Sequence, residues 1–331
     1  MPTVLITPES MLRVQAPYVT ILKEGGFDIR YPKNPQLARG LVTDAETIEE
    51  LQGIDAIIAS GEYFNPAVIA ALPGLRVIAR AGVGYDRVNV PAATQHRVAL
   101  TITPTANHEA VAEHVFAIML ASAKHVVRDD KRLRAGQWSR QLTQPLRGKT
   151  FGLLGLGRIG RSTAIRGVAM GMKVIACETF PNQEFVRSNR IELVDLDTLL
   201  ARSDYLSLHC PLNDQTRGLV NAAFLAKMKL GSTLVNTARG GLVVEKDLVA
   251  ALTSGHLRGA ALDVFEEEPP PADNPLFALD NVVVTPHLAG TDISSLENMG
   301  IECAENIVSL YKGIWPEGAV VNNELRETWK W

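Results

Sequence analysis

Residues 150–160 read TFGLLGLGRIG, with Gly155, Gly157 and Gly160 in the spacing G-x-G-x-x-G. The motif follows a short apolar run and precedes a segment compatible with a helix, which is the context that a dinucleotide-binding turn requires. In such a turn the first glycine allows a tight bend, the second lets backbone amides approach a diphosphate, and the third lets the helix pack closely on the strand. The N-terminus of that helix favours negative charge. We therefore predict a dinucleotide site here that also includes Arg158 and Ile159.

Glu178 ends the next predicted strand, 18 residues after Gly160. An acid at this place can accept hydrogen bonds from both ribose hydroxyls of NAD, and it would repel the additional phosphate of NADP. No arginine or lysine lies between Cys177 and Glu184. The sequence therefore favours NAD as the cofactor, unless Arg187 or Arg190 folds back to bind the NADP phosphate.

On both sides of the motif, short β-branched runs alternate with helical stretches, which predicts parallel βαβ units. Six strands are expected after residue 149, the strand count of a doubly wound dinucleotide fold: 150–154, 173–177, 205–209, 233–236, 260–264 and 282–285. The N-terminal part predicts strands at 3–7, 27–31, 56–59 and 76–79, separated by helices at 12–24, 45–52 and 66–72. Longer helices are expected at 109–124 and 293–311, and the basic stretch 128–149 is interpreted as an arm or linker.

Length and composition indicate a soluble two-domain α/β protein. The chain has 331 residues, of which 46% are apolar and 21% charged, and its net charge of −3 gives no support for a nucleic-acid partner. Three scattered cysteines fit a reducing compartment better than a disulfide-stapled secreted chain. No run of 18 apolar residues is present, and the N-terminus lacks the basic start of a signal peptide. We therefore expect a cytoplasmic protein with no membrane partner.

Several motifs, in a fixed order, resemble the D-isomer-specific 2-hydroxyacid dehydrogenase family, which includes phosphoglycerate dehydrogenase and glyoxylate/hydroxypyruvate reductase. The resemblance extends from about residue 42 to residue 322. Its motifs are ARAGVGYDRVNV (79–90), LRGKTFGLLGLGRIG (146–160), HCPLNDQTRGLVN (209–221), LVNTARGGLVVEKDLVAAL (234–252), GAALDVFEEEP (259–269) and VVVTPHLAG (282–290).

The resemblance implies an architecture of two doubly wound parallel-sheet domains. A Rossmann NAD-binding domain, residues 104–289, would be inserted into a split flavodoxin-like substrate domain, residues 1–103 and 290–331. The two crossings between the domains would form a hinge. The resemblance also implies a homodimer, with residues 109–149 as the dimerisation element.

Three polar residues follow three of the predicted strands: Arg239, Glu268 and His287. The carboxyl ends of parallel strands share one edge of a sheet, and open α/β sheets bind ligands at that edge. The planar guanidinium of an arginine can hold a carboxylate through two hydrogen bonds. A carboxylate beside an imidazole raises the pKa of the imidazole, so the two groups can act as a general acid–base pair. The resemblance assigns catalysis to these three residues, with Arg239 also binding the substrate.

The resemblance adds further site residues. It implies that Asp263 contacts the nicotinamide carboxamide, although an acid at a strand end could equally be a cap. It also implies that the loop Gly82, Val83 and Gly84 binds the substrate carboxylate through backbone amides, which glycines allow to approach closely. The remaining cofactor-binding positions are Cys210, Pro211, Thr216, Thr237 and Ala238. His108, His114 and His209 have no spacing that suggests a metal, so no metal site is expected and His108 and His114 are interpreted as packing or hydrogen-bonding residues.

The function implied is reversible hydride transfer between NADH and a small 2-keto acid of the glyoxylate or hydroxypyruvate type. D-3-phosphoglycerate dehydrogenase is the alternative within the family. Phosphoglycerate dehydrogenases place an arginine after the third strand, whereas this chain has Ala59-Ser60-Gly61-Glu62-Tyr63, with no cation and one acid. Arg80, or the arm of a partner subunit, could compensate for the missing cation. An NAD-sensing, corepressor-like binding protein is the alternative from another functional class.

Overall fold

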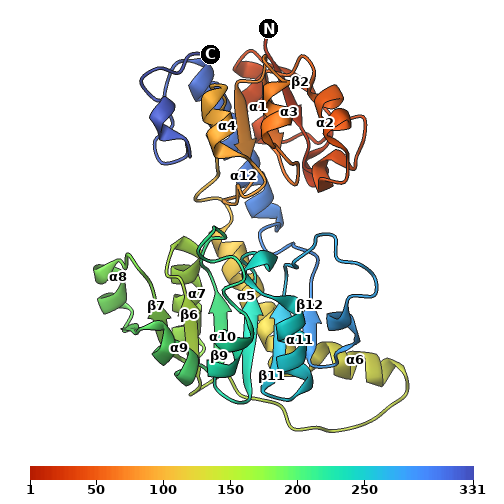
Figure 1. Cartoon of the computed structure of the whole chain (residues 1–331), viewed down its shortest axis with the longest axis vertical. Helices are drawn as coiled ribbons and strands as arrows, with labels where there is room; N and C mark the ends of the chain where they lie inside the picture. Colours follow the sequence, from red (N-terminus) through yellow and green to blue (C-terminus); the bar gives the residue numbers. More distant parts are fainter. The chain divides into compact units, whose positions relative to one another are not determined.

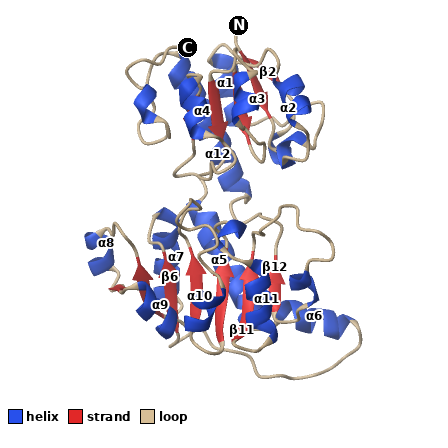
Figure 2. Cartoon of the chain, in the orientation of Figure 1, coloured by secondary structure: helices blue, strands red, loops and turns tan.

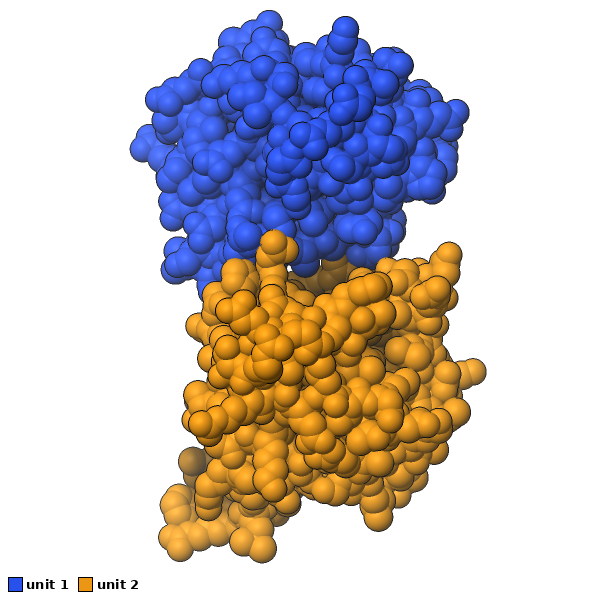
Figure 3. Space-filling model, turned by 90° about the vertical axis from the view of Figure 1, so that its left-hand side faces the viewer, with its two compact units in different colours: residues 1–107, 291–331 blue, residues 108–290 orange.

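The computed structural model describes all residues, 1–331, and the chain forms two compact units. Each unit is a parallel β-sheet with helices on both faces (Figure 1; Figure 2). Unit 1 comprises residues 1–107 and 291–331, and unit 2 comprises residues 108–290 (Figure 3). The two doubly wound parallel sheets that the sequence predicts are confirmed.

The five strands of unit 1 lie in the order β2-β1-β3-β4-β5, and all are parallel. This order, 2-1-3-4-5, is that of flavodoxin-like sheets, in which the strand order reverses between the first and third strands. The strands are β1 (Thr3–Ile6), β2 (Asp28–Arg30), β3 (Ala56–Ala59), β4 (Val77–Arg80) and β5 (Ala99–Thr101).

Helices cover both faces of this sheet because successive strand residues point to opposite sides. Ile58 packs in one cluster with Leu22 of α1 (Pro17–Glu24) and Met299 of α12 (Ile293–Tyr311). Its neighbour Ile57 packs in another cluster with residues of the helices on the opposite face. Those helices are α2 (Asp44–Leu51), α3 (Pro66–Ala70) and α4 (Val90–Gln95). The helix α12 thus belongs to unit 1, although it follows unit 2 in the sequence.

Unit 2 contains seven parallel strands in the order β12-β11-β10-β9-β6-β7-β8. If β6 is numbered 1 and the sheet is followed from β8 to β11, the order is 3-2-1-4-5-6, which is the dinucleotide-binding order. The strand β12 is added beyond β11. The strands are β6 (Thr150–Leu154), β7 (Lys173–Cys177), β8 (Glu192–Leu193), β9 (Tyr205–Leu208), β10 (Ser232–Asn236), β11 (Leu257–Leu262) and β12 (Val282–Val284). The prediction of six strands was wrong by one, because β8 has only two residues.

Two groups of helices cover the sheet of unit 2. The long helix α5 (His108–Ala123) packs beside α7 (Arg158–Ala169), and both contribute to a cluster with Phe151 and Ala176. The opposite face is covered by α9 (Leu196–Arg202), α10 (Ala222–Lys227) and α11 (Glu245–Thr253), while α8 (Gln183–Ser188) follows β7. The sheet is therefore buried on both sides, as parallel sheets are.

The stretch interpreted as a linker begins with a helix, α6 (Val126–Arg134). None of its residues is buried within the chain. An ion pair between Arg134 Nε and Asp130 Oδ2, 2.9 Å long and one helical turn apart, stabilises it locally. No single helix has the length and apolar character of a membrane span; α5 and α6 have them only when taken together, and they meet at a 56° bend.

Candidate active site

The glycine-rich turn lies between β6 and α7, and each glycine has a different environment. A Cβ on Gly155, whose φ is +103°, would lie 2.8 Å from the backbone carbon of His209, and a Cβ on Gly160 would lie 2.4 Å from the Gly155 oxygen. These two positions exclude side chains because backbone packs against them. A Cβ on Gly157, which caps α7, would meet no atom within 4 Å. The approach to the N-terminus of α7 is therefore bare, with Arg158 exposed and Ile159 partly exposed in its first turn.

Glu178 lies beside this turn. Its Oε2 accepts a hydrogen bond from the amide of Leu156 at 2.6 Å, and its Oε1 accepts one from the amide of Phe180 at 2.9 Å. Since β6 and β7 are paired, the ends of both strands bring the carboxylate next to the glycines. The acid thus lies beside the glycine turn, at the end of the neighbouring strand.

The remaining candidate cofactor residues follow β9 and β10. Cys210 and Pro211 come directly after β9, beside β6, where the strand order of the sheet reverses. The hydroxyl of Thr216 donates to the Pro211 oxygen at 2.6 Å. Thr237 is buried, and its hydroxyl has no hydrogen-bond partner. An unpartnered buried hydroxyl is costly, and a ligand that bonded it would remove that cost.

These residues fit a dinucleotide. The bare turn at Gly157 leaves room for a diphosphate, the Glu178 carboxylate can accept from ribose hydroxyls, and the Thr237 hydroxyl has hydrogen-bonding capacity to spare. The amide of Ala238, by contrast, already donates to Asn236 Oδ1 at 3.0 Å.

Arg239 follows β10 in a turn that the Asn236 side chain stabilises through two hydrogen bonds to the backbone. The Asn236 side chain accepts from the Ala238 amide and donates to the Arg239 oxygen at 2.9 Å, while Arg239 Nη1 donates to the Ala238 oxygen at 2.7 Å. A Cβ on Gly240 would lie 1.7 Å from the Phe265 oxygen, so the turns after β10 and β11 touch through backbone. The sequence analysis missed Asn236 and Gly240, although both belong to the motif that contains Arg239.

His287 and Glu268 form a hydrogen-bonded pair. The distance from His287 Nδ1 to Glu268 Oε2 is 2.8 Å, and the side chains are 47% and 19% exposed. The other carboxylate oxygen of Glu268 accepts from the Phe265 amide at 3.1 Å, which fixes its orientation. Because β10, β11 and β12 are adjacent, Arg239, Glu268 and His287 follow three neighbouring strands.

Asp263 directly follows β11, and its side chain is completely buried. Its carboxylate accepts hydrogen bonds from the Thr285 hydroxyl at 2.6 Å and from the amides of Leu288 and Ala289 at 3.0 and 2.9 Å. Burial raises the pKa of this carboxyl, but the hydrogen bonds from His114, Thr285 and the two amides outweigh that effect and bring the pKa below its ordinary value. Asp263 is therefore an ionised carboxylate bound by its own chain.

In unit 1, the loop Gly82, Val83 and Gly84 follows β4. The Gly82 amide donates to Thr103 Oγ1 at 2.9 Å and to the Arg80 oxygen at 2.9 Å, so it is already used within the unit. Arg80 also stabilises this loop, because its Nε donates to the Gly84 oxygen at 3.1 Å.

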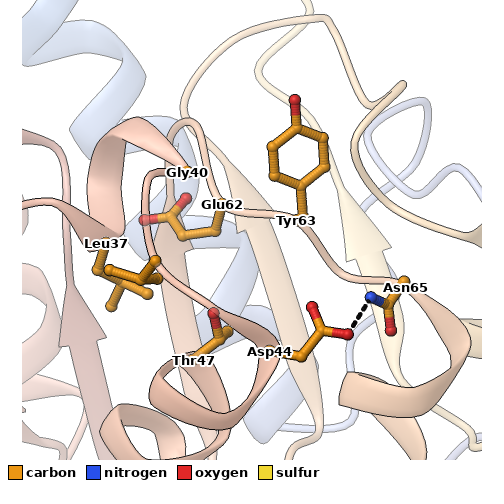
Figure 4. Close-up of a pocket in the computed structure, with 8 residues that line it drawn as sticks. Leu37, Gly40, Asp44, Thr47, Glu62, Tyr63 and Asn65 are labelled. Atoms are coloured by element: carbon orange, nitrogen blue, oxygen red, sulfur yellow. Dashed lines mark hydrogen bonds between the residues drawn. The ribbon is translucent and has the colours of Figure 1, made fainter.

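Glu62 and Arg80 are linked at the ends of β3 and β4. Glu62 is 1% exposed; its Oε2 accepts from the Ser60 amide at 2.5 Å and lies 3.9 Å from Arg80 Nη1. Arg80 Nη1 also donates to the Ser60 oxygen. Glu62 and Tyr63 line one side of a small cavity of about 170 Å³ in unit 1 (Figure 4). Asp44 and Asn65, joined by a 2.7 Å hydrogen bond, line another side.

Residues 116–289 match the family model described as "D-isomer specific 2-hydroxyacid dehydrogenase, NAD binding domain". The chain is 41% identical over 278 residues to the D-3-phosphoglycerate dehydrogenase of Archaeoglobus fulgidus, an alignment that covers 83% of this chain and 53% of the relative. It therefore spans about half the length of that relative. It is 39% identical to the glyoxylate reductase of Thermofilum pendens, with 85% of each chain covered. The crystal structure of D-lactate dehydrogenase from Aquifex aeolicus, complexed with NAD and lactic acid, is similar at a TM-score of 0.83 and 28% identity, covering 97% of this chain and 99% of the other.

Proposed function

Because this chain belongs to the D-isomer-specific 2-hydroxyacid dehydrogenase family, whose NAD-binding domain it contains, we propose that it catalyses reversible hydride transfer between NADH and a small, unphosphorylated 2-keto acid. The observation that carries the proposal is the 2.8 Å pair between His287, which follows β12, and Glu268, which follows β11, the strand next to that of Arg239. Reduction of a 2-keto acid requires a proton donor and a cation, and Arg239, Glu268 and His287 follow strands whose carboxyl ends share one sheet edge with the dinucleotide turn.

NAD, when bound in its reduced form, supplies the hydride that adds to the keto carbon. Arg239 binds the substrate carboxylate and the carbonyl oxygen through its planar guanidinium. His287 in its imidazolium form gives the Nε2 proton that the carbonyl oxygen needs when it becomes a hydroxyl, while its Nδ1–H donates to Glu268, whose carboxylate stabilises the imidazolium. In the oxidation direction His287 takes that proton back. General acid–base work of this kind contributes roughly 10²–10⁴ in rate.

The dinucleotide site is proposed from the residues around the glycine turn. The amides at the start of α7, next to Gly157, bind the diphosphate, and Glu178 accepts from the ribose hydroxyls. Its negative charge disfavours the additional phosphate of NADP, so NAD is preferred. The positions Cys210, Pro211, Thr216, Thr237 and Ala238 complete this proposed site, with the unpartnered Thr237 hydroxyl as the group with most to gain from a bound ligand.

The proposed substrate lacks a phosphate because unit 1 has no available cation where one would be needed. The guanidinium of Arg80 is engaged by the Ser60 and Gly84 oxygens and by Glu62. Arg87 donates to the Gly61 oxygen at 2.6 Å and lies over the Tyr63 ring, 4.6 Å from its centroid. A dianionic phosphate needs charge-assisted partners, each contributing roughly 1.5–3 kcal/mol, and both of these guanidinium groups already bind backbone oxygens of unit 1. We assign the substrate carboxylate itself to the amides of Val83 and Gly84, since that of Gly82 is already used.

D-3-phosphoglycerate dehydrogenase is the second candidate function, because several curated relatives of this chain carry that name. Steady-state oxidation of NADH with glyoxylate, hydroxypyruvate and 3-phosphohydroxypyruvate separates the two candidates, with His287→Ala as the inactive control. We expect a higher kcat/KM for an unphosphorylated acid. A clearly higher kcat/KM for 3-phosphohydroxypyruvate would establish the second candidate. NADH binding without turnover of any keto acid would identify an NAD-sensing binding protein instead.

We also propose that the protein forms a homodimer through residues 109–149. Within this stretch α6 has no buried residue, and Leu133, Trp138 and Leu142 are 57%, 77% and 95% exposed. Large apolar side chains at such exposure favour association with another surface. Sedimentation equilibrium of the wild type and of Trp138→Glu tests this: the wild type should be dimeric and the variant should dissociate at lower concentration.

A further inference from the structure

A chain of hydrogen bonds connects α5 with the ends of β11 and β12, outside the groups that the proposed mechanism uses. His114 Nε2, on α5, lies 2.9 Å from the Thr285 hydroxyl oxygen, and that hydroxyl donates to Asp263 Oδ1 at 2.6 Å. A hydroxyl has a single proton to donate, so Thr285 accepts from His114, whose Nε2 must carry a proton. The direction of the chain is therefore from His114 to Thr285 to Asp263, and His114 Nε2 also lies 3.5 Å from Asp263 Oδ1, so it supports the same carboxylate directly.

Asp263 is also hydrogen-bonded to the turn that contains His287. The amide of His287 donates to the Asp263 carbonyl oxygen at 2.7 Å, and the Asp263 carboxylate accepts from the two following amides, those of Leu288 and Ala289. Three consecutive amides of the turn are thus bound by one residue. His287 itself has φ +51°, a left-handed conformation that a non-glycine residue keeps only where surrounding contacts hold it.

We propose that Asp263, Thr285 and His114 are positioning residues for His287: they hold the left-handed turn after β12 so that the imidazole faces Glu268. The proposal rests on the proposed function for its kinetic consequence, but not for its structural one. It gives Asp263 a role different from direct contact with the nicotinamide, since every part of its side chain is covered by its own chain. His114 and Thr285 bind each other and Asp263, so we propose that they act on His287 through the turn.

The mechanism of the effect is a change in where the imidazole lies. Without the Thr285 hydroxyl, Asp263 Oδ1 loses its shortest hydrogen bond, and the turn can relax out of the left-handed conformation. A displacement of about 1 Å in a catalytic group can cost 10²-fold in rate. We therefore expect kcat to fall at least tenfold, while KM for NADH changes less than threefold because none of these groups faces the glycine turn.

Two pairs of variants test the proposal. Thr285→Val has nearly the same shape without the hydroxyl, and Thr285→Ser keeps the hydroxyl. His114→Phe removes the N–H donor, and His114→Gln keeps one. His256→Phe is the matched control, because His256 is also a partly buried histidine of unit 2 whose Nε2 makes a hydrogen bond, 3.0 Å from the Met228 oxygen, away from this turn.

Two readouts are needed: kcat with a keto acid, and hydrogen exchange at residues 287–289 of the protein without cofactor. Thr285→Val and His114→Phe should lower kcat and accelerate exchange at these amides. The single variants Thr285→Ser and His114→Gln should keep kcat and exchange close to the wild type. The control His256→Phe should change neither quantity. Wild-type kcat and exchange in Thr285→Val would overturn the proposal, and so would equal losses in Thr285→Val and Thr285→Ser. If the wild type turns over no keto acid, the proposed function fails, but the exchange measurements still decide whether the network holds the turn.

Discussion

Replacing two glycines of the same motif should separate stability from cofactor binding. Alanine at residue 160 places a methyl group 2.4 Å from the Gly155 oxygen, well inside van der Waals contact. Alanine at residue 157 meets no atom of the protein within 4 Å, and its backbone φ of −66° is ordinary for any residue. The two substitutions are chemically identical, so any difference between them comes from their surroundings.

The expected magnitudes follow from these distances. Overpacking against backbone in a buried helix–strand contact costs typically 1–3 kcal/mol, which for a unit of this size lowers Tm by roughly 2–12 °C. For Gly157→Ala, the loss of a good N-cap residue and the reduced entropy of the unfolded chain oppose one another, which leaves the free energy of unfolding within about 1 kcal/mol of the wild type. The methyl group would instead occupy the approach of the diphosphate. Losing one charge-assisted hydrogen bond of about 1.5–3 kcal/mol weakens NADH binding at least tenfold.

Thermal unfolding followed by circular dichroism and NADH titration followed by fluorescence measure the two effects. Gly157→Ala should unfold like the wild type and bind NADH at least tenfold more weakly. Gly160→Ala should unfold at a lower temperature. Wild-type NADH affinity in Gly157→Ala would refute the placement of the diphosphate at this turn, and an unchanged Tm in Gly160→Ala would refute the argument from close backbone contact.

Three further predictions concern single side chains. His287→Ala should lower kcat by two or more orders of magnitude with little change in NADH affinity, and a wild-type kcat would remove this residue from the mechanism. The wild type should prefer NADH to NADPH at least tenfold in kcat/KM, and Glu178→Ala should narrow the gap; equal use of both by the wild type would contradict the assignment. Burial lowers the pKa of His209 to about 4, so the unfolded state binds the additional proton below about pH 6.5. The contribution of neutral His209 to the free energy of unfolding should therefore be fully present above pH 6.5 and fall by at most about 3 kcal/mol between pH 6.5 and pH 4. Urea unfolding of the wild type across this range should show this decrease, and His209→Asn should not.

The strands could be predicted from the sequence because each is a short apolar run bounded by turns. The predicted strands at 150–154 and 173–177 coincide with β6 and β7. The exceptions have physical reasons. The strand β8 has only Glu192 and Leu193, and β5, which the four predicted N-terminal strands did not include, has only three residues, so both are too short for a clear pattern. The helix α6 buries no residue within the chain, so no contact with the core of unit 2 marked it as a helix in the sequence.

The start of helix α1 was indicated in the sequence by Pro17, but the prediction gave more weight to the apolar residues before it. The expected helix began at Leu12, whereas α1 begins at Pro17, with Ala16 in an extended conformation before it. Proline is tolerated at the first position of a helix, where its missing N–H has no partner to lose. The residue before a proline is also driven away from helical angles. Pro17 therefore marks the start of the helix, and the apolar residues before it do not extend it.

In the candidate site, the sequence predicted which residues follow the strand ends, but it did not predict what surrounds each of them. Asp263 and Glu268 both follow β11 within six residues of its end; Glu268 was expected to face the imidazole, and Asp263 either a ligand or, as a cap, the backbone. One turn, that after β12, gives them opposite environments. With His287 at φ +51°, the amides of Leu288 and Ala289 point at Asp263 and cover it, while the imidazole is directed to Glu268. No residue pattern in TPHLAG specifies a left-handed histidine, because the conformation is held by contacts from a residue more than twenty positions earlier in the chain. Residues that donate or accept across such distances are therefore visible only once the fold has brought their strands together.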